Sequence, residues 1–444
     1  MRRYASGVLR ALCAVLCAAG ANCVYFLARF GAYGLAPAAA ALFSAGLFLT
    51  MLSGIGISGA RLFFLNWGSE TLKCFVICLC ISAAYHIVLL FVCVPQDMRL
   101  WLISAGVCAA ALAFQFWVGI ITVYCLSLQL GIKQRLLGIL CGMIPVLHLI
   151  MLRRIVRLCS REVGFETYRQ TLDKSREGDK VCRTKYPLLF VHGVFFRDFK
   201  HINYWGRITA ALRKNGAVIY YGDHQSAASV SDSGKELADR IRLIVAETGC
   251  EKLNVIAHSK GGLDMRSALC CGAAPYVASL TTINTPHRGC EFADYLLKIA
   301  PCNLKQKLAR TYNRAARVLG DRRPDFLAAV DDLTAEKCKK FDAETPVPQG
   351  IYCRGVMSKM KKACGGKFPL NFTYKLAKYF DGDGDGLVSV ESARWGEDFV
   401  LVEPEGERGI SHGDIIDLNR ENIPGFDVRE FYVGLVSDLK ARGL

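Results

Sequence analysis

Hydrophobic residues follow two different patterns along the 444-residue chain. In the first third they form long runs that are apolar on all sides and broken only by single charges. Such a run is typical of a helix in a bilayer, which needs about 20 apolar residues, and not of a soluble surface helix. The pattern therefore predicts an all-α transmembrane region over residues 1–155. It has about five spans, namely 11–28, 30–60, 74–96, 100–132 and 136–152.

A second pattern begins after a polar and charged stretch, residues 156–185, which is interpreted as a linker. Short apolar, β-branched runs there alternate with helical stretches. This alternation predicts an α/β domain over residues 186–444, with a mostly parallel sheet covered by helices on both faces. Residues 290–346 are long for a loop between strands and predict a helical lid or cap. The expected strands are Pro187–Val191, Ala217–Tyr221, Leu253–Ala257, Ser279–Ile283, Ile351–Arg354 and Phe399–Val402.

Composition and charge support this division. Hydrophobic residues make up 52% of the chain, which excludes a disordered protein. Residues 1–160 hold 12 Lys and Arg against two acids, so the net charge of +16 is concentrated beside the apolar runs. These positive charges are interpreted as residues that flank membrane spans. They are not interpreted as a nucleic-acid-binding surface, because the sequence contains no recognisable nucleic-acid-binding module. The flanking charges nearly balance between the two sides, so the side of the α/β domain stays open, as does the oligomeric state.

The strongest chemical signal is Ala257-His-Ser-Lys-Gly261, which directly follows an apolar strand and precedes a helical pattern. A small residue, serine and glycine at this spacing form a nucleophile elbow. Its tight turn requires small residues at positions such as Gly261. The turn exposes the Ser259 hydroxyl and directs the amide of Lys260 at a developing oxyanion.

A second strand ends in Val191-His-Gly193-Val194. The amide of Val194 is the expected second oxyanion donor, and Gly193 lets the backbone approach a substrate carbonyl. Serine chemistry also needs a base and a group that orients it. In the chain order of this architecture, Ser-acid-His, the base is His412.

The acid lies in Asp381-Gly-Asp-Gly-Asp-Gly-Leu-Val-Ser389. Asp385 is the first candidate to orient His412, and Asp383 is the second. A calcium loop is the rival interpretation of these three acids. An EF-hand loop would need a bidentate glutamate where Ser392 stands, and flanking helices are absent from the pattern.

Residues 186–440 resemble the bacterial triacylglycerol lipases of the α/β-hydrolase superfamily. The matching motifs stand in family order: Val191-His-Gly, Ala257-His-Ser-Lys-Gly-Gly262, Ile283-Asn-Thr-Pro-His-Arg-Gly289, Asp385-Gly-Leu-Val-Ser and His412-Gly-Asp414. The resemblance implies Ser259, Asp385 and His412 as the triad. It also implies structural calcium at Asp414, but the second calcium-binding Asp of these relatives has no counterpart here.

These observations predict a membrane-anchored serine ester hydrolase that acts on lipid esters and needs no redox cofactor. Two alternatives stay open. One is an acyltransferase with the same triad. The other is a membrane transport or sensing protein with a regulatory α/β-hydrolase module, although the apolar runs hold few ionisable residues beyond His86 and His148.

Overall fold

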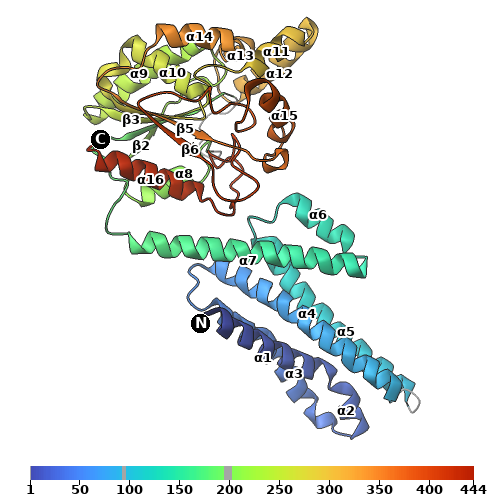
Figure 1. The fold of residues 1–444 in the computed structure, drawn as a ribbon. Coiled ribbons are helices and arrows are strands. Elements are labelled where there is room, and N and C mark those ends of the chain that lie inside the picture. Colours follow the sequence, from blue (N-terminus) through green and yellow to red (C-terminus); the bar gives the residue numbers. More distant parts are fainter. Residues whose placement is uncertain (1, 93–96, 195–202) are drawn as a thin grey trace. The chain divides into compact units, whose positions relative to one another are not determined.

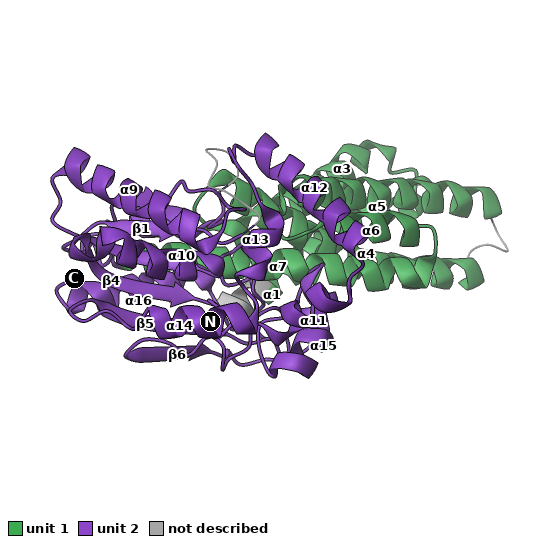
Figure 2. Ribbon diagram, turned by 90° about the horizontal axis from the view of Figure 1, so that it is seen from above, with its two compact units in different colours: residues 1–175 green, residues 176–444 purple. Residues whose placement is uncertain are grey.

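A computed structural model describes residues 2–92, 97–194 and 203–444 (Figure 1). The chain forms two compact units, Met1–Ser175 and Arg176–Leu444, shown in different colours in Figure 2. The first unit contains only helices among its described residues, and the second contains the sheet.

The first unit consists of long helices joined by short turns. Residues of α1, α4, α5 and α7 share one apolar cluster, which includes Leu65, Leu72 and Val123. Small residues let the helices approach closely, because a side chain at Gly68 or Gly119 would collide with the facing helix. The helices are α1 (Arg2–Asn22), α2 (Val24–Arg29), α3 (Ala36–Leu49), α4 (Ala60–Val92), α5 (Met98–Leu126), α6 (Ile132–Cys141) and α7 (Pro145–Ser175).

Four helical segments of the described chain are long and apolar enough to cross a membrane. They are Gly7–Arg29, Tyr33–Gly54, Ala60–Val92 and Met98–Leu126. The sequence predicts about five spans, and the fifth, over 136–152, is not among these four. Helix α6 has only ten residues, and the run then turns at Gly142 into the charged helix α7.

The predicted linker over 156–185 is wrong for its first two-thirds, which form the C-terminal part of α7. The physical reason is an apolar stripe hidden among arginines. Leu152, Ile155, Val156, Cys159 and Val163 recur at helical spacing and are buried in the cluster of the first unit. The boundary between the two units consequently falls at Ser175.

The second unit is built on six parallel strands in the order β2-β1-β3-β4-β5-β6. All six coincide with strands expected from the sequence to within a few residues. Buried apolar runs such as Leu253–His258 predict such strands, because a parallel sheet is covered on both faces. The strands are β1 (Leu188–Val191), β2 (Ile219–Tyr221), β3 (Leu253–His258), β4 (Val277–Ile283), β5 (Tyr352–Ser358) and β6 (Asp398–Val402).

Helices cover the two faces of this sheet (Figure 1). On one face, α8 (Ile208–Lys214) and α16 (Val428–Ala441) contribute Leu212 and Tyr432 to an apolar cluster with β1. On the other, α9 (Val230–Thr248) and α10 (Lys260–Ala268) contribute Ile241 and Met265 to a second cluster. The carboxyl end of β3 is thereby held between two packed layers.

The predicted lid region, 290–346, is helical. It contains α11 (Glu291–Ile299), α12 (Cys302–Val318), α13 (Phe326–Asp331) and α14 (Ala335–Glu344). Helix α14 is tied to α10 by the buried Arg266, which pairs with Asp342 at 2.8 Å and also donates to Thr345. A further helix, α15 (Leu370–Asp381), precedes the predicted acid loop.

Candidate active site

Ser259 lies in the sharp turn between β3 and α10. Its backbone has φ 54° and ψ −130°, a conformation that a non-glycine residue rarely adopts. Neighbouring backbone holds the turn, because the Ser259 amide donates to the Ile283 carbonyl at 2.9 Å. A side chain at Gly261 would collide with the carbonyls of Val191 and His192. The pattern of small residues around Ser259 is therefore explained by the lack of space for a larger side chain at Gly261.

The structure brings the three predicted triad residues together from separate loops. The Nε2 atom of His412 lies 3.0 Å from the Ser259 hydroxyl oxygen. Its Nδ1 atom lies 2.6 Å from Oδ2 of Asp385. The His412 amide also donates to the Asp385 carbonyl at 3.0 Å, which fixes the ring's attachment. A proton on Nδ1, held by the carboxylate, leaves Nε2 as an acceptor toward the serine.

Of the three acids in the predicted loop, Asp385 is the one that contacts His412. Asp383, the second candidate, instead pairs with Lys359 at 2.9 Å and Lys378 at 2.8 Å. These two ammonium groups hold the pKa of Asp383 below its ordinary value. Asp381 accepts from the amides of Glu291 and Phe292 at the start of α11. The loop therefore separates its carboxylates into one that faces the histidine and two that support structure.

Asn284 orients Asp385, and the sequence analysis assigns it no role. Its side-chain amide donates to Oδ2 of Asp385 and, at 2.7 Å, to the Ser358 hydroxyl. The second oxygen of Asp385 accepts from the amides of Leu387 and Val388. The carboxylate is fully buried, so these donors hold it in one orientation. One feature of the sequence could have indicated Asn284. It directly follows the strand Val277–Ile283, within the motif Ile283-Asn-Thr-Pro-His-Arg-Gly289.

The expected oxyanion turn lies beside the serine. A Cβ atom added to Gly193 would lie 2.9 Å from Cβ of Ser259, so the glycine is required by the close approach. Tyr204, which the sequence analysis also missed, accepts from the Gly193 amide at 3.0 Å. The same hydroxyl lies 2.7 Å from Nδ1 of the buried His258. Val194 follows in the described chain, and Lys260 is the first residue of α10.

His258 and His412 have adjacent rings with centroids 4.5 Å apart, but different surroundings. Burial, together with the nearby His412, lowers the pKa of His258 well below its ordinary value. His258 is therefore neutral near pH 7. Its ring adds no competing cation beside His412.

A buried ion pair lies beneath the elbow. The Lys260 ammonium contacts Oδ1 of Asp264 at 2.6 Å and the Ser233 hydroxyl at 3.2 Å. Burial raises the pKa of Asp264 to about 6, and the Lys260 charge opposes this shift. His224 lies 3.4 Å from the second oxygen of Asp264 and stacks on His192. These contacts anchor the residue whose amide is the expected oxyanion donor.

The residues at Asp414 do not fit a calcium ion. Its carboxylate accepts from the Arg408 guanidinium at 2.9 and 3.1 Å and from the amide and hydroxyl of Ser411. A fixed cation already neutralises it, and Arg408 also pairs with Glu421 at 3.0 Å. Within the described ranges, no group of three or more His, Cys, Asp or Glu side chains is placed to hold a metal.

Named relatives are similar in sequence to part of this chain, although no family model matches it. A triacylglycerol lipase from Pseudarthrobacter phenanthrenivorans is 33% identical over 180 residues, which are 38% of this chain and 56% of the relative. Triacylglycerol lipase 2 of Saccharomyces cerevisiae is 28% identical over 274 residues, which are 56% of this chain and 76% of the relative. The resemblance to triacylglycerol lipases is confirmed. The matched region spans about half the length of these bacterial triacylglycerol lipases.

Among solved structures, a lipase from Bacillus licheniformis in its mature form is 24% identical with a TM-score of 0.43. The match covers 57% of this chain and 92% of that lipase. A Staphylococcus hyicus lipase is 18% identical with a TM-score of 0.44, over 59% of this chain and 97% of that one. The unit's own topology defines the fold. A parallel sheet with helices on both faces carries a strand-serine-helix elbow, the α/β-hydrolase arrangement.

Proposed function

We propose that this chain is a membrane-anchored serine ester hydrolase that acts on lipid esters. One observation carries the proposal. A serine hydroxyl on a strained elbow contacts a histidine at 3.0 Å, and that histidine contacts a buried carboxylate at 2.6 Å. A nucleophile, base and orienting acid in this geometry perform acyl transfer.

In the proposed reaction, His412 accepts the Ser259 proton while the serine oxygen attacks the ester carbonyl carbon. Asp385 stabilises the imidazolium that forms. The C–O bond to the alcohol then breaks, and the leaving oxygen takes the proton from His412. A water molecule, deprotonated by the same histidine, attacks the acyl-serine. The bond between the acyl carbon and the Ser259 oxygen then breaks, the fatty acid leaves, and His412 returns its proton to Ser259.

Backbone amides complete the proposed mechanism. The amides of Val194 and Lys260 would donate to the oxygen that becomes negatively charged in each tetrahedral intermediate. The first turn of α10 adds the positive end of a helix dipole at the same place. All the groups in the proposed mechanism belong to the chain, and the proposal includes no redox cofactor.

The lipid substrate class is supported by the relatives' names and by two features of the chain. Four helical segments are apolar and long enough to anchor the protein in a bilayer. On α12, Leu304 and Leu308 are exposed on a helix that also carries exposed Lys307, Arg310 and Arg314. An apolar stripe within a basic surround favours contact with a lipid surface.

The test is ester hydrolysis by the full-length chain in detergent micelles, with p-nitrophenyl esters of short and long acyl chains. Ser259→Ala should abolish hydrolysis, while Ser231→Ala, at an exposed serine on α9, should leave it unchanged. Faster turnover of long chains would indicate a lipase rather than a short-chain esterase. Wild-type protein that is folded but inactive on every ester would contradict the proposal.

The same assay separates hydrolysis from acyl transfer. Product analysis with and without added glycerol measures whether the acyl group goes to water or to an alcohol. Free fatty acid as the main product in both cases is expected. Acyl glycerol as the main product would instead identify a transferase with the same triad.

A further inference from the structure

The α6–α7 hairpin, residues 132–161, exposes an apolar surface that the described part of the helical unit leaves uncovered. Its apolar side chains include Ile132, which is 74% exposed, and Met143, which is 88% exposed. Apolar side chains concentrated in this way mark an interaction surface. The exposed set is Ile132, Leu136, Ile139, Leu140, Met143, Ile144, Val146, Leu147, Leu149 and Ile150.

This hairpin is too short to cross a bilayer. Helix α6 has ten residues, and the apolar start of α7 covers residues 145–152, so the two arms are about 15 and 12 Å long. The hydrocarbon core of a bilayer is about 30 Å thick. Arms of this length reach into one leaflet, and the turn at Gly142 returns the chain to the surface where it entered.

Four arginines follow the apolar arm of α7. They are exposed, and residues 132–161 contain no Asp or Glu. Three of them recur every four residues, which places like charges next to each other and is unfavourable for an isolated helix. The ion pairs printed for the described helices of this unit involve other side chains. An anionic partner outside the chain would offset this repulsion. The four are Arg153, Arg154, Arg157 and Arg161.

Contacts with α4 place these arginines outside the hydrocarbon core. All charged residues of α4 precede residue 74, and residues 74–92 are close to the ~20 residues that a span needs. The Ser160 hydroxyl lies 2.8 Å from that of Ser69, and Glu162 pairs with Arg61 at 2.6 Å. Both contacts fall on the charged beginning of α4. This part of α7 therefore lies at the level of the lipid headgroups.

The apolar arm of α7 lies deeper. The His148 ring contacts Phe116 of α5 with centroids 5.1 Å apart, and Phe116 contacts Phe75 of α4 at 5.4 Å. Phe75 belongs to the beginning of the stretch of α4 without Asp, Glu, Lys or Arg. The hairpin thus has apolar arms at the edge of the hydrocarbon core and arginines one level above them, as an amphipathic interfacial segment has.

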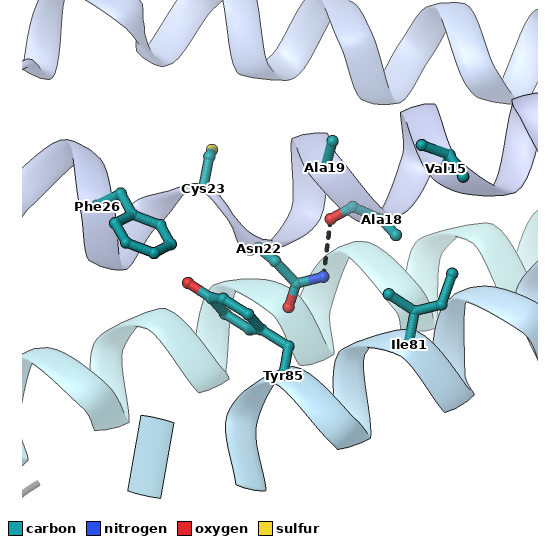
Figure 3. A pocket seen from close by; sticks show the side chains of 8 residues that line it. All are labelled: Val15, Ala18, Ala19, Asn22, Cys23, Phe26, Ile81 and Tyr85. Carbon is teal, nitrogen blue, oxygen red and sulfur yellow. Dashed lines mark hydrogen bonds between the residues drawn. The ribbon is translucent and has the colours of Figure 1, made fainter. Parts of the chain in front are cut away.

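The charge of the helical unit is concentrated at this end of its long helices. Near the opposite end, the sequence has only Arg29, Asp97 and Arg99 as charged residues. A groove toward that end, between the α1–α2 segment and α4, has no charged lining residue (Figure 3). Lys and Arg concentrate on the cytoplasmic side of membrane proteins, where leaflets carry anionic lipids. The basic end of the helices consequently fits an anionic leaflet.

We propose that the α6–α7 hairpin lies on the anionic leaflet of a membrane, where its four arginines bind phospholipid headgroups. Their guanidinium groups donate to phosphate oxygens. The apolar side chains around Met143 enter the boundary between headgroups and acyl chains. The proposal accounts for an apolar run, 136–152, that is not a span. It rests on the membrane insertion in the proposed function and is independent of the ester chemistry.

The test is hydrogen–deuterium exchange of the full-length chain in nanodiscs, measured by mass spectrometry of peptides within residues 132–150. One nanodisc contains only phosphatidylcholine, and in the other a third of the lipid is phosphatidylglycerol. Exchange should be slower by about tenfold or more in the anionic nanodisc, because each arginine near an anionic surface strengthens binding about fivefold. Salt at about 0.5 M should reduce this difference by screening.

Two matched variants identify the charges that matter. The first replaces the hairpin arginines, as Arg153→Gln, Arg154→Gln, Arg157→Gln and Arg161→Gln, and should make exchange equal in the two nanodiscs. Unchanged exchange in peptides of α4 shows that this variant is folded. Lysine at the same four positions should retain most of the difference. The control removes four exposed charges of the α/β unit and should also retain it, as Lys337→Gln, Lys339→Gln, Lys340→Gln and Lys375→Gln.

Equal exchange of the wild type in the two nanodiscs would overturn the proposal, as would a difference that persists in the arginine-to-glutamine variant. A slowing that follows the number of chains per nanodisc, and not the lipid charge, would overturn it in favour of a second copy on the apolar surface. Ser259→Ala should retain the difference, so an inserted chain without esterase activity contradicts only the proposed chemistry. A chain that does not enter nanodiscs contradicts the membrane anchoring itself.

Discussion

The two units each contain a buried carboxylate held by several donors, and the comparison shows what distinguishes a structural acid from a reactive one. In the helical unit, Glu162 accepts from Arg61 at 2.6 Å, from the Ser127 hydroxyl at 2.6 Å and from two backbone amides. In the α/β unit, Asp385 accepts from two backbone amides, from Asn284 and from His412.

The difference lies in the group beyond the carboxylate. The partner of Glu162 is an arginine, whose charge is permanent, so the pair holds helices together and does nothing further. The partner of Asp385 is a histidine whose other nitrogen faces a strained serine. That ring can gain a proton and lose it again near neutral pH. Burial and the number of hydrogen-bond donors alone do not distinguish the structural acid, Glu162, from the reactive acid, Asp385.

The largest expected effect comes from exchanging each acid for its amide. Asp385→Asn keeps the shape of the side chain but favours the wrong histidine tautomer. We expect kcat for ester hydrolysis to fall by roughly 10³–10⁴-fold. Glu162→Gln in the same detergent-solubilised chain should leave kcat within about twofold, because Glu162 is part of the helical unit's packing. Equal losses in both variants would break the distinction between the two carboxylates.

A third buried carboxylate, Asp264, sharpens the comparison because its partner is a lysine. Asp264→Asn leaves the Lys260 ammonium buried without its counter-charge. We expect it to destabilise the α/β unit by about 3–5 kcal/mol, measured as a lower temperature of activity loss. The double variant Lys260→Met with Asp264→Leu should recover most of that loss. A single variant as stable as the wild type would show that the pair is dispensable.

Much of the fold and the site followed from sequence because the signals were local. Six strands and the elbow at Ser259 were read from short apolar runs and small residues. Local signals could not show that Asn284 holds Asp385 across 101 positions of sequence, or that Tyr204 supports Gly193. They also misread 156–175 as linker, because the arginines of α7 concealed the face that packs on other helices.

The next largest effect on kcat is expected from Asn284, which orients Asp385. Asn284→Ala removes one donor from Asp385, whose two backbone donors remain. We expect kcat to fall about tenfold with KM unchanged, as for one hydrogen bond to a charged group. Asn284→Asp would bring a second negative charge to Asp385 and should lower kcat further. A change in KM without a change in kcat would contradict a positioning role.

The smallest effect is expected at Ser127, because it donates to Glu162 in the helical unit as Asn284 donates to Asp385 in the α/β unit. Ser127→Ala removes the hydroxyl that donates to Glu162 at 2.6 Å, while Arg61 and the two amides remain. We expect a loss of about 1 kcal/mol in the stability of the helical unit and no change in kcat. Stability is measured by a thiol-reactive dye during heating, since Cys159 and Cys74 are fully buried in that unit. Ser58→Ala, at an exposed serine of the same unit, is the control. A fall in kcat with Ser127→Ala would mean that Glu162 is linked to the reaction after all, which the arrangement of its donors argues against.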